Sequence, residues 1–196
     1  MGVPPGFNTP AVGFEQPFAM LEACHERVQR TLALLGRLRE HVREQGCDDS
    51  ARQAARDVLR YFDIAAPLHH QDEELHVFPP LLAQGAPAVV ALVRRLLQDH
   101  GDMVADWAAA RQPLQALADG QIRAFGAADE TALDRFAGRY ARHVADEERV
   151  AYPAVLQLLR PDALEPMGRE MAARRQAPRA GAIRPSLQPG LPRAAP

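Results

Sequence analysis

The sequence of 196 residues contains no lysine, and all 23 of its basic residues are arginines. Against 25 acidic residues these leave a formal net charge of only -2, which gives no support for a nucleic-acid-binding surface. No apolar run approaches the length of about eighteen residues that a membrane helix needs. The N-terminus also lacks the basic segment followed by an apolar one that marks a secretory signal. We therefore expect a cytoplasmic protein that binds neither nucleic acid nor membrane.

Cysteine is scarce as well, with only Cys24 and Cys47 in the chain. Both are predicted on one helix, where a rise of ~1.5 Å per residue would separate them by more than roughly 30 Å. This excludes a disulfide framework. Apolar residues never alternate with period two over a useful length, so no β-sheet is expected.

Apolar residues instead recur every seven residues along four long segments, as in the line Leu21, Val28, Leu35 in the first of them. Such lines are typical of amphipathic helices. The four segments are residues 16–45, 50–83, 87–118 and 128–159. Prolines inside two of the helices predict kinks near residues 67, 79 and 113. Four helices joined by short turns predict an all-α fold, an antiparallel up-down-up-down four-helix bundle.

The composition changes outside the predicted bundle, residues 15–160. Residues 1–14 are rich in proline and glycine and are predicted to form a flexible arm. Residues 161–196 hold 7 of the 17 prolines and six arginines against three acidic residues, and are predicted to form a mostly disordered Pro/Arg-rich tail. At most a short helix is expected at 162–175. Because no apolar stripe is evident there, the tail should contribute little to stability.

The second and fourth helices contain an internal repeat. HHQDEELHVFPPLL, which begins at His69, aligns without gaps with HVADEERVAYPAVL, which begins at His143. The aligned pairs include His69 with His143, Asp72 with Asp146, Glu73 with Glu147, Glu74 with Glu148, Phe78 with Tyr152 and Pro79 with Pro153. The spacing His-x-x-x-Glu places an imidazole and a carboxylate one turn apart on the same helix face. Both pairs fall on the apolar lines and therefore point into the predicted bundle.

The other two helices each contribute one inward histidine, His25 and His100. A buried carboxylate without a partner is very costly, and these lines hold no inward arginine that could pair with it. A metal resolves the difficulty, and six nitrogen and oxygen ligands suit two iron or manganese ions better than one tetrahedral zinc. The predicted ligands are His25, His69, Glu73, His100, His143 and Glu147.

Three further residues lie close to the predicted ligands, and each has two interpretations. His70 is one step off the ligand line, so it lies at a boundary or in solvent unless it binds metal. His76 is on the ligand line, but Val150 holds the matching place in the other repeat. His76 is therefore an outer residue of the site, a core residue or a ligand. Tyr140 points inward, either to hydrogen-bond a bound oxygen species or to pack in the core.

Several polar residues are expected outside the site. His41 lies on the far side of its helix from His25 and is predicted at the surface. Glu74 and Glu148 point away from the inward faces of their helices and are predicted to be solvated. Trp107 is predicted to be a core residue.

Four segments in order, QPFAMLEACHERV, HHQDEELHVFP, LLQDHGDM and HVADEERVAYP, resemble the four helices of a hemerythrin-like, His-His-Glu cation-binding domain. The resemblance covers about residues 16–160. It implies a four-helix bundle that holds a non-haem di-iron centre, with or without an oxo or hydroxo bridge, in which glutamates bridge the irons. The six predicted ligands match the ligand places of the family. Its members carry oxygen, sense oxygen or redox state, store iron, or repair damaged iron centres.

Two departures separate this sequence from the oxygen carriers. Carriers have a second histidine one turn after that of the third helix, where Val104 stands here, and an aspartate five residues after the last histidine, where Glu147 follows at four. The sequence therefore resembles the wider bacterial group. We expect a di-iron protein that binds or responds to O2, NO or peroxide. The alternatives are an enzyme that reduces these molecules and a structural bundle without metal. No protein partner is indicated.

Overall fold

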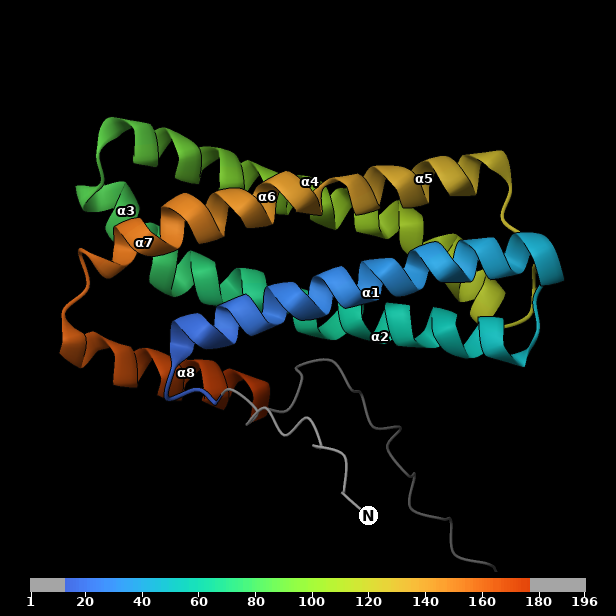
Figure 1. Cartoon of the computed structure of the whole chain (residues 1–196), viewed down its shortest axis with the longest axis horizontal. Helices are drawn as coiled ribbons and strands as arrows, with labels where there is room; N and C mark the ends of the chain where they lie inside the picture. The colour runs from blue at the N-terminus through green and yellow to red at the C-terminus, as the bar shows by residue number, and fades with distance from the viewer. Residues whose placement is uncertain (1–12, 177–196) are drawn as a thin grey trace, which may run out of the picture.

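The computed structural model describes residues 13–176, and these residues form helices joined by short turns, with no strand among them (Figure 1). This confirms the predicted all-α class. The α-helices are α1 (Pro17–Gln45), α2 (Asp49–Asp72), α3 (Phe78–Gln84), α4 (Pro87–Ala118), α5 (Ala127–Gly138), α6 (Tyr140–Asp146), α7 (Tyr152–Leu156) and α8 (Leu164–Gln176). Within the described part of the chain, no helix has an apolar stretch long enough to cross a membrane.

Four long helical rods lie side by side in Figure 1. Helices α1 and α4 are rods by themselves. Helix α2 continues through a π-helical turn, Glu73–Val77, into α3, and α5 continues through α6 and a second π-helical turn, Glu147–Ala151, into α7. Each rod runs back along the one before it, as the colours of Figure 1 show. The four rods correspond to the four segments that the sequence predicts.

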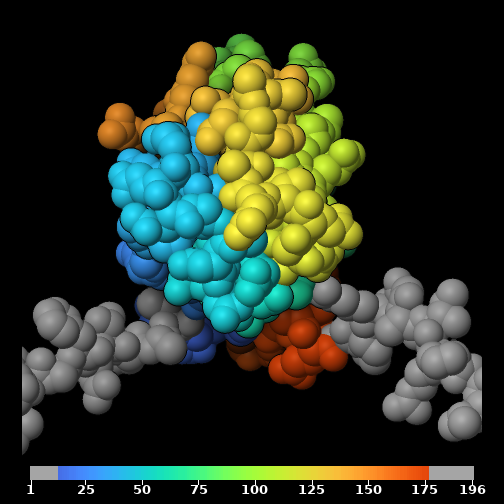
Figure 2. All heavy atoms as spheres, turned by 90° about the vertical axis from the view of Figure 1, so that its right-hand side faces the viewer, coloured from blue at the N-terminus to red at the C-terminus, as the bar shows by residue number. Residues whose placement is uncertain are grey.

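The turn between α1 and α2 follows the local sequence signals. Gly46 ends α1 with a φ of 78°, which glycine adopts without strain, and the side chain of Asp48 caps α2 by accepting a hydrogen bond from the amide of Ala51. The prediction that Cys47 lies on the same helix as Cys24 is wrong, because Cys47 lies in this turn. Both thiols are free. Figure 2 looks at this end of the molecule, where the turn packs against the one that follows α4.

Only one of the three expected proline kinks interrupts a helix. Helices α2 and α4 are continuous through Pro67 and Pro113. The break near Pro79 is the π-helical turn Glu73–Val77 that joins α2 to α3.

The apolar core has two parts, one toward each end of the rods. One part includes Phe62 and Phe136, whose rings meet edge to face at 4.8 Å, with Trp107 packed against it. The other part includes Leu21 and Phe78. On every rod the buried histidines and glutamates fall between the two parts, so apolar layers flank the polar residues on both sides.

Helix α8 corrects the prediction that the C-terminal segment has little to bury. Met167 and Met171 are buried in the same core as Leu21. At Gly168 an added Cβ would lie only 1.8 Å from the carbonyl oxygen of Phe14, so the residues before α1 pass directly against α8. Residues 177–196 of the predicted tail and 1–12 of the predicted arm lie outside the described residues.

Ion pairs also join α8 to the second rod. The carboxylate of Asp72, fully buried, lies 2.6 Å from the guanidinium nitrogens of both Arg174 and Arg175. One turn along, Nε2 of His76 lies 2.5 Å from Glu170. Helix α8 is therefore held by polar as well as apolar contacts to the rod that carries Glu73.

Candidate metal centre

The two sequence repeats share the same irregular backbone. In the π-helical turns, the amide of Phe78 bonds to the carbonyl of Glu73, and the amide of Tyr152 bonds to that of Glu147. Each turn ends two residues before a proline, which has no N–H to donate and whose ring clashes with the carbonyl four residues earlier. A turn with one extra residue relieves this clash, and such turns are frequent at functional sites. The repeat in sequence is thus a repeat in geometry.

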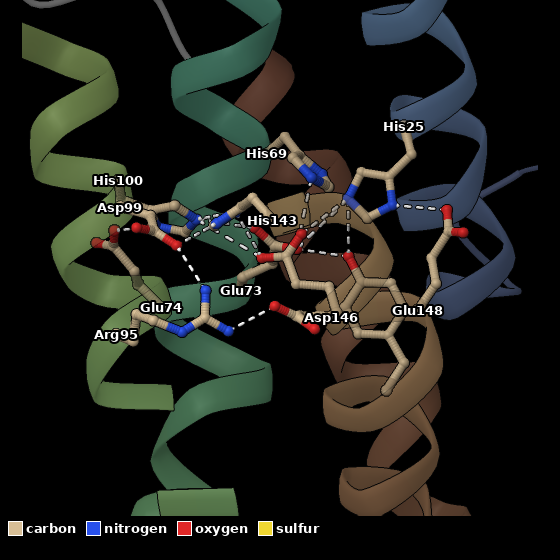
Figure 3. Close-up of polar contacts among 12 residues, drawn as sticks. His25, His69, Glu73, Glu74, Arg95, Asp99, His100, His143, Asp146 and Glu148 are labelled. Atoms are coloured by element: carbon tan, nitrogen blue, oxygen red, sulfur yellow. Dashed lines mark hydrogen bonds and ion pairs between the residues drawn. The ribbon is translucent and has the colours of Figure 1, made fainter. Parts of the chain in front are cut away.

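The six predicted ligands converge between the rods, and all are at most 3% exposed (Figure 3). Their donor atoms form two groups, each with all atoms within 4.8 Å of one another. One group is His25, His69, Glu73 and Glu147; the other is His100, His143 and Glu147. The four histidines therefore form two pairs, and Glu147 belongs to both groups.

Each of the two glutamates turns one oxygen toward each histidine pair. Oε2 of Glu147 lies 3.2 Å from Nε2 of His25, while its Oε1 lies 2.9 Å from Nε2 of His143. Oε1 of Glu73 lies 3.4 Å from Nε2 of His69, while its Oε2 lies 3.5 Å from Nε2 of His100. The two carboxylates lie side by side and span the space between the pairs.

Several buried atoms in the cluster have no hydrogen-bond partner, namely both carboxylate oxygens of Glu147, Oε2 of Glu73 and Nδ1 of His69. Leaving buried charged groups unpaired is costly. In addition, Nε2 of His100 and Nε2 of His143 face each other at 3.1 Å, which brings two lone pairs together unless a proton or cation lies nearby. Cations within the cluster would satisfy all of these atoms except Nδ1 of His69. The donor set of imidazoles and carboxylates fits iron or manganese.

Glu74 and Glu148 reach the cluster from outside, although the sequence predicted them in solvent. Oε1 of Glu148 lies 2.9 Å from Nδ1 of His25, and Oε1 of Glu74 lies 2.8 Å from Nδ1 of His100 (Figure 3). Their side chains are 39% and 43% exposed, but each carboxylate accepts from a buried ring. A histidine that donates Nδ1–H to a carboxylate keeps Nε2 free for a metal, which is the usual outer arrangement of metal-bound histidines. The alignment of Glu74 with Glu148 was the signal that could have identified them.

Asp99 takes the same outer position for His143, at 3.4 Å from its Nδ1. Arg95 holds this aspartate from the other side at 3.3 Å and also bonds Asp146 at 2.5 Å (Figure 3). This chain of charges could not be predicted from the sequence, because its members come from two rods, of α4 and α6, whose relative rotation the periodicity does not determine.

Tyr152, which the repeat aligns with Phe78, also contacts the cluster, although the sequence did not indicate this role. Its hydroxyl donates to Oε1 of Glu73 at 2.5 Å and lies 3.3 Å from Nε2 of His25. Its ring stacks on His25 with 5.6 Å between centroids. Phe78, the corresponding residue of the first repeat, has no hydroxyl, so Glu147 receives no such bond.

The two central carboxylates differ in acidity. Burial raises the pKa of Glu73 well above its usual range, and the neighbouring charge of Glu147 raises it further. Burial acts on Glu147 in the same sense, but the close imidazoles of His100, His143 and His25 outweigh it and hold the pKa of Glu147 well below its usual range. Burial also lowers the pKa of His69, followed by the charge of His25. Without metal, Glu73 therefore holds a proton more readily than Glu147, and burial disfavours the charged form of His69.

The other residues singled out by sequence lie around the cluster. The ring of His70 stacks on that of His100, with centroids 4.0 Å apart and planes 13° apart, and burial lowers the pKa of His70. Tyr140 is buried among the aromatic rings around Phe62. His41 bonds Asp48 at 3.0 Å near the surface.

His76 contacts α8 through Glu170, although a regular helix would place it on the same line as His69. The π-helical turn Glu73–Val77 contains one residue more than a regular turn, and one residue rotates the following side chains by about 100°. This rotation accounts for the direction of His76.

Comparison with known proteins agrees with this arrangement. A family model of the hemerythrin HHE cation binding domain matches residues 16–155, which include all six clustered residues. An uncharacterized protein of Haemophilus influenzae is 34% identical over 163 residues, which make up 83% of this chain and 92% of that relative.

Proposed function

The chain belongs to the hemerythrin HHE cation-binding family, and we propose that its up-down-up-down four-helix bundle holds two iron ions, with manganese as the alternative metal. The observation that carries this proposal is that Glu73 and Glu147 each turn one oxygen toward each of the two histidine pairs. His25 and His69 would hold one ion and His100 and His143 the other. The two glutamates would bridge them.

We further propose that the protein binds or responds to O2, NO or peroxide, as a redox or oxygen sensor or as a scavenger. Iron held by few protein ligands supplies one-electron chemistry and positions for a small ligand. Val104, which stands in the place of the fifth histidine of oxygen carriers, is 65% exposed and cannot ligate. The outer carboxylates Glu74, Glu148 and Asp99 would fix the ring orientation of their histidines and keep Nδ1 protonated.

Metal analysis of protein purified without oxygen tests the first part of this proposal. We expect about two iron atoms per chain, because one ion per histidine pair satisfies both groups of donors. A ratio near one, or zinc as the main metal, would contradict a two-iron centre.

Stopped-flow absorbance of the reduced protein mixed with oxygenated buffer tests the second part. We expect oxidation that pumping off the oxygen does not reverse, because a centre with fewer nitrogen ligands should pass electrons to O2 more readily. Recovery of the reduced spectrum under vacuum would instead indicate an oxygen carrier.

An enzyme that reduces O2, peroxide or NO is a second candidate. A surface pocket that includes His100 in its lining favours it, since substrate could reach the site repeatedly. Sustained consumption of peroxide or NO in the presence of a reductant would distinguish the enzyme from a protein that only binds.

A further inference from the structure

An apolar pocket of about 180 Å³ opens between α2 and α4, toward the aromatic part of the core. Its apolar lining includes Phe62, Ala66, Met103, Trp107, Phe136 and Tyr140. The one charged residue in the lining is Asp63, whose carboxylate already accepts bonds from Trp107 and Arg111. The pocket thus offers a small molecule apolar contact and no free charge. Apolar cavities of about 150 Å³ are known to bind xenon or benzene.

His70 stands between this pocket and the centre. It lines the apolar pocket and also a second pocket, which reaches His100 and Glu74. Its ring covers the face of His100 at 4.0 Å and lies 6.3 Å from His143. Val104 lines both pockets at their outer side. A molecule in the apolar pocket would therefore meet the His70 ring before it met His100.

The opposite end of the centre is covered. His25 is 1% exposed, and the buried ring of Tyr152 stacks on it. Phe18 in turn packs edge to face on Tyr152 at 5.7 Å. Access from the apolar pocket is thus directed to the pair His100 and His143.

We propose that small neutral molecules of the class of O2 and NO reach the centre at the His100 and His143 end through the apolar pocket, and that the His70 side chain controls their passage. This inference rests on the proposed function, since it names the route by which the ligand arrives. The route can be tested separately from the metal centre, because neither His70 nor Val104 is among the six proposed ligands.

Xenon tests the pocket independently of iron. Crystals of the full chain under xenon pressure should show xenon among Phe62, Met103 and Trp107. The variant Val104→Phe should lose it, because a larger side chain at this exposed position fills the pocket mouth. The matched control Leu156→Phe, at another exposed apolar position outside this lining, should keep it. Xenon bound elsewhere, or xenon retained in Val104→Phe, would overturn the proposal.

Kinetics test the passage. Iron content should be the same in wild type, His70→Ala, Val104→Phe and Leu156→Phe. The association rate of NO with the reduced protein should rise at least about fivefold in His70→Ala and fall at least about tenfold in Val104→Phe, because a gate limits association. Leu156→Phe should match wild type. Unchanged rates in either pocket variant would overturn this inference while leaving the iron centre in place, whereas absence of iron from wild type would contradict the proposed function and leave the xenon result standing.

Discussion

In the first repeat, residues 69–82, the carboxylate of Glu73 accepts a bond from the hydroxyl of Tyr152. In the second repeat, residues 143–156, Glu147 has no such donor, because Phe78, the counterpart of Tyr152, lacks a hydroxyl. Both glutamates lie at the start of equivalent π-helical turns and span the same two histidine pairs. Yet the pKa of Glu73 is raised and that of Glu147 is lowered. Two segments of the same backbone therefore carry carboxylates that differ in their affinity for a proton.

The comparison extends to the flanking residues. Asp72 is fully buried and paired with two arginines of α8, while its counterpart Asp146 is partly exposed and paired with Arg95 of α4. His143 has an outer carboxylate at Nδ1, and His69 has none. The repeated sequence determines where the ligands lie. The neighbours that differ between the repeats determine the pKa values of the two glutamates and the polar contacts around the ligands.

Removing either bridging glutamate should have the largest effect, because it breaks what the two repeats share. Glu73→Ala and Glu147→Ala should each weaken iron binding by at least about a hundredfold, since loss of an outer partner alone typically costs ten- to a hundredfold. Iron per chain after dialysis measures it, with circular dichroism to check folding. His41→Ala, at a surface histidine, is the control. If either glutamate variant kept wild-type iron, that residue would not be a bridge.

Neutralising the two aspartates should separate the repeats by stability. Asp72→Asn leaves Arg175 without a carboxylate and Arg174 with only the more exposed Glu170, and should cost about 3 kcal/mol, as breaking buried pairs does. Asp146→Asn should cost less than about 1 kcal/mol, because its pairs are more exposed. Urea unfolding measures both. Equal losses would show that α8 contributes no more than Arg95 does.

Replacing Tyr152 by phenylalanine should make the repeats more alike. The hydroxyl bond lowers the pKa of Glu73, against its burial, so without it this carboxylate should hold a proton more tightly and compete less well for metal. A bond to a charged group contributes about 1.5 kcal/mol or more, which corresponds to roughly a tenfold loss of affinity. Competition with a chelator measures it, and Tyr140→Phe, in the aromatic core, should match wild type. Wild-type affinity in Tyr152→Phe would show that the hydroxyl does not tune Glu73.

The smallest expected effect is on acid stability of the metal-free protein. Burial lowers the pKa of His69, so the unfolded chain binds a proton that the folded chain refuses once the pH falls below about 6.5. The raised pKa of Glu73 acts in the opposite sense. The contribution of His69 is therefore measured as the difference between wild type and a variant that lacks this histidine. Between pH 7 and 5.5, wild type should lose about 1 kcal/mol more of its unfolding free energy than His69→Gln.

Urea unfolding of chelator-treated protein at several pH values measures this difference, with His41→Gln as the matched control. Parallel pH profiles of wild type and His69→Gln would mean that His69 is not held neutral by the fold.

The rods and the six clustered residues could be predicted because both depend on local order. Apolar lines every seven residues fix which face of each helix is buried, and His25, His69, His100 and His143 lie on those lines. The duplicated His-x-x-x-Glu can be recognised in the sequence without knowing how the rods are rotated against one another. Any arrangement that buries these faces brings the ligands together.

Features that depend on the rotation of one rod against another were missed. Glu148 and Glu74 lie one residue beyond the inward line, and only the neighbouring rod decides whether they meet water or a histidine. The packing of α8 could not be predicted, because its buried face consists only of Met167, Gly168 and Met171. Three such residues do not form an apolar pattern that is long enough to recognise in the sequence. The π-helical turn before Pro79 was expected only as a kink, and the one before Pro153 was not expected, although the repeat aligns the two prolines.

The repeat gives each half of the chain an equal share of the centre. The hairpin of α1 and α2 brings His25, His69 and Glu73, and the hairpin formed by α4 with α5 and α6 brings His100, His143 and Glu147. The donor group His100, His143 and Glu147 lies within the second hairpin, whereas the other group joins His25, His69 and Glu73 of the first hairpin to Glu147 of the second. The latter group is therefore complete only when the two hairpins pack together, and Glu147 is the residue that links them.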